Sequence, residues 1–324
     1  MHFKWTMAMS ALAAFLMGAA GASAQTTLKW AHVYETSEPF HTESVWAAEE
    51  IERRTEGRYH IDVYPASQLG KELDINQGLQ LGTVDIIISG PSFAARDFPR
   101  VGVTYFPYIF RSPDHLLAYA KSDIFKELAG GYEEETGNHV TAVTYYGTRQ
   151  TTSNRPIEAC ADMQGLKMRV PDVPAYLAMP RACGANTAPI AFAEVYLALQ
   201  NGTVEAQENP LTTIEAKKFF EVQKYIVLSG HIVDHLFTTI SPTAWSQLSE
   251  EDQAIFTEVM QQAAERATKI IVERENALVE TFRERGLTVS EVDKADFEKN
   301  VLEKVTLEEF GYEQADYDAI RAVQ

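Results

Sequence analysis

The chain has 324 residues and carries 46 acidic against 28 basic side chains, a net charge of −18 at pH 7. Such an excess of negative charge argues against nucleic acid or an anionic membrane surface as a partner. About 300 residues follow the N-terminal segment, enough for two domains or one large one.

The first 24 residues have the pattern of a secretory signal peptide. Lys4 gives a weakly basic start, an apolar run covers about residues 7–20, and a small-residue segment ends at Ala24. This predicts export with cleavage after Ala24. A membrane anchor is the alternative, but the apolar run is short and interrupted by glycine.

The order β-α-β-α-β is predicted for the first half of the mature chain. Strands are expected at 28–34, 59–65 and 83–90, with helices at 41–57 and 73–82. The third strand, TVDIIISG, is too apolar to face water on either side, as central parallel strands are. The order predicts an α/β sheet with helices on both faces.

The same order begins again after residue 138, which predicts a second lobe. Strands are expected at 139–147, 165–171 and 205–209, and helices at 173–184 and 192–202. Pro180 should distort the first of these helices, because it cannot donate a backbone hydrogen bond.

A single long helix is predicted at 249–286, since no proline or glycine occurs before Gly286. Ser249 is the expected N-cap, and the helix would reach roughly 55 Å, more than one small lobe. It could therefore brace both lobes, which we expect to be joined by strands. The predicted division is 25–146 plus 235–274 for lobe I, and 147–234 plus 275–324 for lobe II.

The chain contains two cysteines, Cys160 and Cys183. In a reducing compartment they would be buried free thiols. In an exported protein they are expected to form a disulfide, and closing that loop would contribute roughly 3 to 4 kcal/mol.

Catalytic motifs are missing from the sequence: there is no HExxH, GxSxG or GxGxxG, and no phosphate-binding glycine loop. His231 and His235 are the one histidine pair at helical spacing, and their apolar surroundings favour partly buried side chains over a metal site. We therefore predict no enzyme activity, no metal and no cofactor.

Two arginines suggest binding chemistry. Arg149 follows a predicted strand and is expected in a polar turn within YYGTRQTTSNRPI. Arg169 lies near the end of GLKMRVPD, where Pro171 stops the strand. Ligands of open α/β sheets bind beyond the carboxyl ends of strands, and a guanidinium matches a carboxylate with two parallel hydrogen bonds. Ordinary surface ion pairs explain these arginines equally well from the residues alone.

Five blocks of the chain resemble one family. They are YPASQLGKE (64–72), LQLGTVDIIISG (79–90), GTRQTTSNRPIEACADMQGLKMRVPD (147–172), PIAFAEVYLALQNGTVEAQENP (189–210) and FFEVQKYIVLSGHIVDHLF (219–237). The amino-acid sequences of these blocks and their order along the chain are similar to those of the DctP-type substrate-binding proteins of tripartite ATP-independent periplasmic (TRAP) transporters. The resemblance runs from about residue 28 to 286, and the sialic-acid-binding branch of the family is the most similar in sequence.

The resemblance implies a two-lobed α/β periplasmic binding protein (type II-like) with a cleft and a long bracing helix. It also implies a monomeric periplasmic receptor that traps a small organic acid. The receptor would deliver this acid to the small and large membrane subunits of the transporter, with an ion gradient as the energy source.

The resemblance also assigns site residues. Arg169 matches the family's carboxylate anchor, and Arg149 the arginine that assists it. Asn209 and Phe192 match pocket-lining residues, and Glu72 an acidic contact from the first lobe. Core packing for Phe192 and a solvated loop charge for Glu72 are the alternatives.

Two positions depart from the sialic-acid branch. That branch has an asparagine after the first strand and a glutamate after the third, where this chain has Val33 and Gly90. The difference argues against sialic acid as the ligand. His32 and Ser89 are further candidate contacts, and the reason is solely that they lie at the ends of predicted strands.

The expected function is a periplasmic receptor for a small carboxylate. Glu72, Asn209 and Ser89 suit a hydroxylated ligand, which favours a sugar acid such as a uronate over a C4-dicarboxylate such as malate, succinate or fumarate. A dicarboxylate would need another cation, and the candidates are His32, His231 and Lys71. An exported α/β enzyme and a sensor component are the alternatives from other classes.

Overall fold

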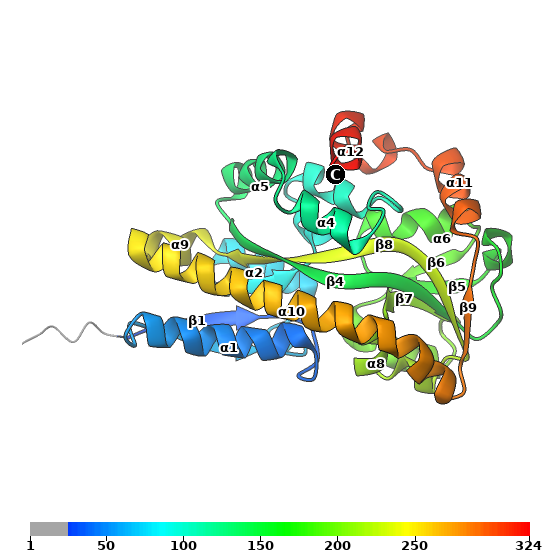
Figure 1. Cartoon of the computed structure of the whole chain (residues 1–324), viewed down its shortest axis with the longest axis horizontal. Coiled ribbons are helices and arrows are strands. Elements are labelled where there is room, and N and C mark those ends of the chain that lie inside the picture. Colours follow the sequence, from blue (N-terminus) through cyan, green and yellow to red (C-terminus); the bar gives the residue numbers. More distant parts are fainter. Residues whose placement is uncertain (1–24) are drawn as a thin grey trace, which may run out of the picture.

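The computed structural model describes residues 25–324. The predicted signal peptide and its cleavage after Ala24 lie outside the described residues. Figure 1 shows an elongated molecule in which helices flank a continuous sheet. Among the helices of residues 25–324, none combines the length and the apolar composition that crossing a bilayer requires.

In this part of the chain, one mixed sheet of nine strands confirms the predicted α/β class. Its order is β2-β1-β3-β8-β4-β7-β5-β6, and β9 pairs with β8 outside this path. β1 is parallel to β2 and β3, whereas β8 is antiparallel to β3 and β4. The strands are β1 (Thr26–Ala31), β2 (Tyr59–Tyr64), β3 (Ile86–Ser89), β4 (His139–Ser153), β5 (Lys167–Val170), β6 (Asn186–Pro189), β7 (Ala206–Pro210), β8 (Tyr225–Ile240) and β9 (Thr288–Glu291).

The two longest strands, β4 and β8, run the length of the sheet and join its two ends. Residues 237–240 of β8 pair with β3, while residues 225–228 pair with β9. Residues 149–153 of β4 pair with β7. The β4–β8 register shifts near residue 146, between Tyr145 and Gly147. The strand groups β1–β3 and β5–β7 are therefore connected by continuous strands.

Helices pack beside both strand groups. The helices of the first half are α1 (Pro39–Arg54), α2 (Glu72–Leu81), α3 (Pro91–Ala94), α4 (Pro113–Tyr119) and α5 (Asp123–Thr136). Those of the second half are α6 (Ala178–Ala182), α7 (Val195–Gln200), α8 (Leu211–Ala216), α9 (Pro242–Gln247), α10 (Glu250–Glu284), α11 (Lys294–Lys304) and α12 (Gln314–Arg321).

The predicted long helix is α10, with 35 residues. Its N-cap is Ser249, whose hydroxyl accepts a hydrogen bond from the Asp252 backbone N–H (3.1 Å), and acidic side chains occupy the first turn, where the helix dipole favours them. α10 contacts α1 in the first half of the chain and α8 and β9 in the second, and it crosses β4 between them. Figure 1 shows it spanning most of the molecule. This confirms the predicted long helix.

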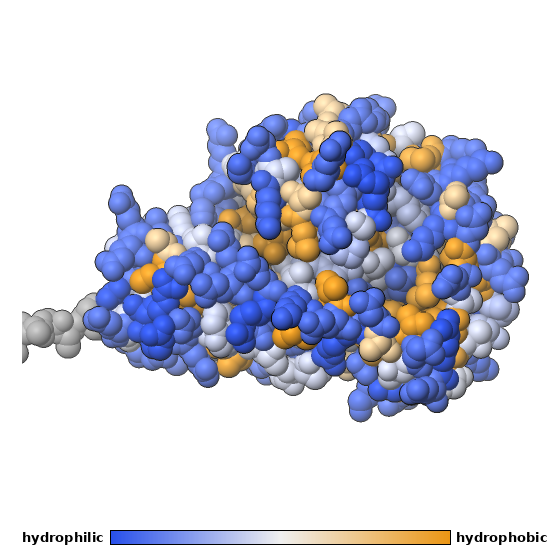
Figure 2. Space-filling model, viewed as in Figure 1, coloured by the Kyte–Doolittle hydropathy of each residue, from blue (hydrophilic) through white to orange (hydrophobic). Residues whose placement is uncertain are grey.

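The surface in Figure 2 is mostly hydrophilic, in keeping with the high net charge. Its apolar side chains gather in a hollow between α10 and the α4–α5 pair, over β4. This groove has a volume of about 750 Å³, and Leu117, Phe125 and Val272 lie on its wall. It shares no lining residue with the cleft described below.

Several sequence expectations need correction. The helix expected at 173–184 is divided into a 3₁₀ turn, Pro174–Leu177, and the short α6. Pro180 in α6 has no N–H to donate to the carbonyl of residue 176, so the regular helix is interrupted there, and the distortion expected at Pro180 is present. The helix expected at 192–202 likewise begins with a 3₁₀ turn. The short edge strand β6 was not predicted, because NTAP has no apolar alternation.

Cys160 and Cys183 form a disulfide, as predicted. The lobe division stays a prediction, and the last two helices contact different parts of the chain. α11 packs on α6, whereas α12 packs on the 3₁₀ helix Pro99–Tyr105 and on α5. α12 therefore lies against residues of the predicted lobe I, although 275–324 was assigned to lobe II.

Candidate functional site

A cleft with two connected chambers lies where β1, α2 and α3 face β4, β5 and β7. The inner chamber is narrow, with about 20 Å³ of free volume, and the outer chamber has about 220 Å³. A water molecule takes about 30 Å³ of liquid volume, so the outer chamber offers room for a small organic molecule. The residues that line both chambers are Glu72, Phe93, Arg169, Pro171 and Phe192.

Arg149 lies inside β4 and not in a turn after it. It is opposite Pro210 of β7 and Ile232 of β8, because β4 continues to Ser153. The turn expected from the polar sequence after Tyr146 is replaced by strand, since both neighbouring strands supply backbone partners and the hydroxyl side chains are buried. This places the guanidinium at the floor of the inner chamber.

Nearly all the donors of Arg149 are in use. Its Nη2 donates to Glu208 Oε1 (2.8 Å) and Asn209 Oδ1 (3.1 Å), its Nε donates to Glu208 Oε2, and its Nη1 donates to Asp234 Oδ2 (2.7 Å). The guanidinium also lies 4.8 Å from the ring centre of Tyr176. An arginine has five N–H donors, so at most one remains for a ligand.

Arg169 is equally buried, with 2% of its surface exposed, but has few partners. Its Nε donates to the Ile190 carbonyl (2.9 Å), and no ion pair is formed with any residue in 25–324. The terminal Nη atoms therefore keep their four N–H donors, and the residue lines both chambers. Burial lowers the pKa of Arg169 to about 10, so the group remains charged at neutral pH. It is a buried cation whose free donors point to the cleft.

The carboxyls beside Arg149 form one network with His231. Burial favours the protonated form of Glu208, but Arg149 and His231 hold its pKa below the usual value. His231 Nε2 lies 3.2 Å from Glu208 Oε2, and its Nδ1 lies 2.9 Å from the Ser229 hydroxyl. Burial lowers the pKa of His231, which keeps the imidazole neutral at pH 7.

Glu72 lies across the chambers from the arginines, at the first turn of α2. Within residues 25–324 its carboxylate has no hydrogen bond or ion pair with another side chain. Burial raises its pKa, although Arg169 and Arg149 act in the opposite direction. It is a cleft carboxylate and not a solvated loop charge, because it lines both chambers and its carboxyl group is bonded to its own backbone N–H and to no other side chain.

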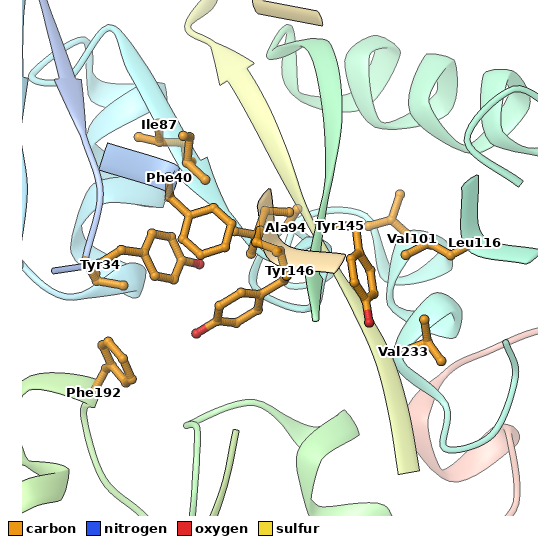
Figure 3. Close-up of a cluster of buried hydrophobic side chains, with 14 of the residues drawn as sticks. Tyr34, Phe40, Ile87, Ala94, Val101, Leu116, Tyr145, Tyr146, Phe192 and Val233 are labelled. Atoms are coloured by element: carbon orange, nitrogen blue, oxygen red, sulfur yellow. The ribbon is translucent and has the colours of Figure 1, made fainter. Parts of the chain in front are cut away.

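Aromatic rings form the walls. Tyr34 lies 5.2 Å from the ring of Tyr146 and 6.4 Å from that of Phe192. Figure 3 shows the Tyr34, Phe40 and Tyr146 rings close together, with Phe192 projecting toward them from another element. Phe192 both belongs to the buried core and lines the cleft, so the two alternatives for this residue are not exclusive.

Two sequence candidates are not brought to the cleft. His32 lines neither chamber; its Nε2 lies 3.3 Å from His41 Nδ1, and burial lowers its pKa to about 3. Ser89 also lines neither chamber, and its hydroxyl accepts a hydrogen bond from Asn76 Nδ2 (2.8 Å). The chain reaches the cleft further on, at Tyr34 and Gly90, which lie beyond the last residues of β1 and β3.

Several lining residues could hardly be identified from the sequence. Tyr34, Phe93, Tyr146 and Tyr176 resemble ordinary core aromatics in the sequence, whereas Glu208 within the buried stretch AQENP is a charge that a strand interior seldom carries. Gly90 leaves no room for a side chain, since a Cβ there would lie 2.7 Å from the Tyr105 hydroxyl. Asn209 lines the inner chamber, but its amide already binds Arg149 and Gln207.

Known proteins match nearly the whole described chain. The family model of "Bacterial extracellular solute-binding protein, family 7" (DctP) matches residues 30–310. A solute-binding protein of Roseobacter denitrificans is 35% identical over 298 residues, covering 91% of this chain and 90% of the relative. The sialic acid-binding periplasmic protein SiaP of Vibrio cholerae is 33% identical over 282 residues, covering 87% and 88%.

Solved structures agree with this match. That Roseobacter denitrificans protein with bound L-galactonate has a TM-score of 0.85 at 33% identity, covering 91% of this chain and 98% of the other. A protein of Ochrobacterium anthropi with bound L-fuconate has a TM-score of 0.85 at 28% identity, covering 92% and 99%. Both are described as TRAP periplasmic solute-binding proteins, which have two lobes. The chain therefore belongs to the DctP family of TRAP transporter solute-binding proteins.

Proposed function

We propose that this protein is a periplasmic receptor that binds a sugar acid through Arg169 and delivers it to the small and large membrane subunits of a TRAP transporter. The family is periplasmic, and its members bind small carboxylates and work with membrane subunits. The observation that carries the proposal is the buried Arg169, whose four terminal N–H donors face the cleft without a partner in residues 25–324.

A carboxylate is the partner that suits this group. Two parallel charge-assisted hydrogen bonds would satisfy a desolvated guanidinium that now has one neutral acceptor. Arg149 contributes little directly, since its donors are engaged by Glu208, Asp234 and Asn209. Its role is to hold the floor of the chamber and to offer at most one further N–H.

The remainder of the cleft suits a hydroxylated ligand. Glu72 offers a carboxylate that no other side chain in residues 25–324 binds, and the rings of Phe93 and Phe192 offer flat apolar faces. The related structures contain L-galactonate and L-fuconate, which are polyhydroxy acids of this kind. A uronate or an aldonate fits these features. A receptor for a C4-dicarboxylate is the second candidate within the same transporter class.

Closure of two lobes around the ligand would complete the site. Tyr34 and Glu72 belong to predicted lobe I (25–146 plus 235–274), whereas Arg169 and Phe192 belong to predicted lobe II (147–234 plus 275–324). Contacts from both sides stabilise a closed form. We propose the register shift of β4 at residues 145–147 as the hinge position in that strand.

A thermal-shift screen of the mature protein against organic acids tests the function. The panel holds aldonates, uronates, aldarates, C4-dicarboxylates, sialic acid and apolar monocarboxylates. A ligand that binds the native state raises the melting temperature by mass action, and we expect aldonates or uronates to give the largest rise. A rise with C4-dicarboxylates alone would favour the second candidate, and no rise with any acid would contradict a carboxylate receptor. Turnover assays on ester, amide and glycoside substrates test the exported-enzyme alternative.

A further inference from the structure

The charges around the cleft bear on how many carboxylates a ligand can carry. Resting on the proposed function, we propose that the cleft selects monocarboxylates: Arg169 takes one carboxylate, and Glu72 across the chambers excludes a second. Aldonates and uronates are then ligands, whereas aldarates and C4-dicarboxylates are rejected.

The positive charge of Arg149 is already compensated. The side chains of Glu208 and Asp234 are both 0% exposed and both form ion pairs with it. One cation therefore faces two carboxyl groups at the floor of the inner chamber. Its single remaining N–H can assist a carboxylate held by Arg169, but Arg149 supplies no net charge for a second one.

Glu72 faces the same cavity as Arg169. Both line the inner and the outer chamber, and no ion pair joins them. A ligand whose carboxylate lies on Arg169 extends its other end through chambers bordered by Glu72. Because no other side chain in residues 25–324 binds the Glu72 carboxylate, a ligand hydroxyl can donate to it, whereas a second carboxylate meets a like charge.

The buried basic groups nearby do not offset this charge. His32 and His231 are buried and neutral at pH 7. Lys217 forms an ion pair with Glu35 (2.6 Å), lies 5.1 Å from the ring centre of Phe192 and lines neither chamber. None of the three supplies a cation to the far end of a ligand.

The outer rim is acidic on balance. Lys71, Asp172 and Glu194 line the outer chamber and are exposed to solvent. One lysine is offset there by two carboxylates, and exposed charges are strongly screened by water and salt. Lys71 therefore cannot serve as a strong second anchor.

Calorimetry on matched acids tests the proposal. D-galactonate and galactarate differ only at C6, which is a hydroxymethyl group in the first and a carboxylate in the second; D-gluconate and D-glucarate form a second pair. In the pair whose aldonate binds more tightly, we expect the aldonate to bind about 100-fold more tightly than its aldarate. This is a difference in binding free energy of about 2.7 kcal/mol, at about 1.4 kcal/mol per tenfold change in affinity. An aldarate that binds as tightly as its aldonate would overturn the monocarboxylate rule and leave the proposed function standing. If no aldonate, uronate or aldarate binds, the proposed function fails and the rule fails with it.

Glu72→Gln separates charge from shape. The amide keeps the size and an acceptor oxygen but removes the negative charge, so the aldonate-to-aldarate affinity ratio should narrow by about tenfold. Glu49→Gln on the exposed face of α1 removes the same charge outside the cleft lining; it is the matched control and should change the ratio by less than about twofold. An unchanged ratio in a well-folded Glu72→Gln protein would show that Glu72 does not determine this selectivity.

Discussion

Arg149 and Glu208 form a buried ion pair between the neighbouring strands β4 and β7, with Nη2 and Oε1 2.8 Å apart. Both side chains are almost without solvent exposure, and Asp234 engages the same guanidinium. Arg169 lies at the same chamber with no carboxylate partner in residues 25–324. Two arginines of equal burial therefore differ in their partners, and we propose a different task for each: Arg149 stabilises the floor of the cleft, and Arg169 binds the ligand.

Substitution of Arg169 should affect ligand binding above all. Removing one member of a buried, hydrogen-bonded charge pair costs about 2 to 5 kcal/mol, so Arg169→Ala should weaken affinity by roughly 30-fold to several thousand-fold. Arg169→Lys should not restore it, because an ammonium cannot make two parallel hydrogen bonds. Calorimetry with the best acid from the screen measures this, with Arg181→Ala on the exposed side of α6 as the control. Near-wild-type affinity for a folded Arg169→Ala protein would exclude the anchor role.

Substitution of Arg149 should instead affect folding. Arg149→Ala leaves Glu208 and Asp234 buried without their cation, which should lower the free energy of unfolding by about 3 to 5 kcal/mol. Arg169→Ala removes one hydrogen bond to a carbonyl, and a loss of about 1 kcal/mol is expected. Denaturant unfolding without ligand compares the two variants. Equal losses would contradict the division of tasks.

Glu38 should make stability depend on pH. Its carboxyl accepts hydrogen bonds from Thr213 Oγ1 (2.9 Å) and from the Glu35 backbone (2.7 Å), and burial raises its pKa from 4.5 to about 7. The folded state then binds this proton more tightly than the unfolded state. The resulting stabilisation is complete below about pH 4.5 and is lost as the pH rises through about 7.

Unfolding of wild type and Glu38→Gln at several pH values tests this. Between pH 5 and pH 8, wild type should lose up to about 3 kcal/mol relative to the variant, because each unit of pKa shift corresponds to about 1.4 kcal/mol. Glu49→Gln, on the exposed face of α1, controls for the change in net charge. A wild-type curve parallel to that of Glu38→Gln would show that this carboxyl does not titrate as expected.

The disulfide should hold the second strand group together. Cys160 precedes the turn that leads into β5, and Cys183 follows α6. The double substitution Cys160→Ser and Cys183→Ser should lower stability by about 3 kcal/mol, because the unfolded chain regains the freedom of the closed loop. Intact mass with and without reductant checks the bond in exported protein. Two thiols that alkylate freely in the native protein would contradict it.

Ligand binding should compact the molecule. Sites on both predicted lobes contribute to one cleft, and β4, β8 and α10 connect them. Solution scattering should give a smaller radius of gyration with a saturating aldonate or uronate than without it. The Arg169→Ala protein, which should not retain the acid, serves as the control. An identical radius in both states would count against closure.

A large part of the fold was predictable from local patterns. The strands near residues 28, 59 and 83 and the helix that follows Ser249 occur as expected, because apolar periodicity and the N-cap are local properties. The failures came where partners decided the outcome. β6 is a strand because β5 lies beside it, and β4 continues through a polar stretch because β7 and β8 satisfy its backbone.

The family could be recognised from the amino-acid sequence, because the blocks around Arg149 and Arg169 are long and specific, and the same blocks point to the two arginines. Which of the two arginines has free donors follows from the folded structure and not from the blocks. That depends on Glu208 and Asp234, which are 59 and 85 residues from Arg149 along the chain and reach it only when β7 and β8 pair with β4. The tertiary structure also decided that Tyr34 and Gly90, and not His32 and Ser89, line the cleft. Tyr34 and Gly90 lie beyond the ends of β1 and β3, where the path of the chain depends on the elements packed around it and not on strand alternation.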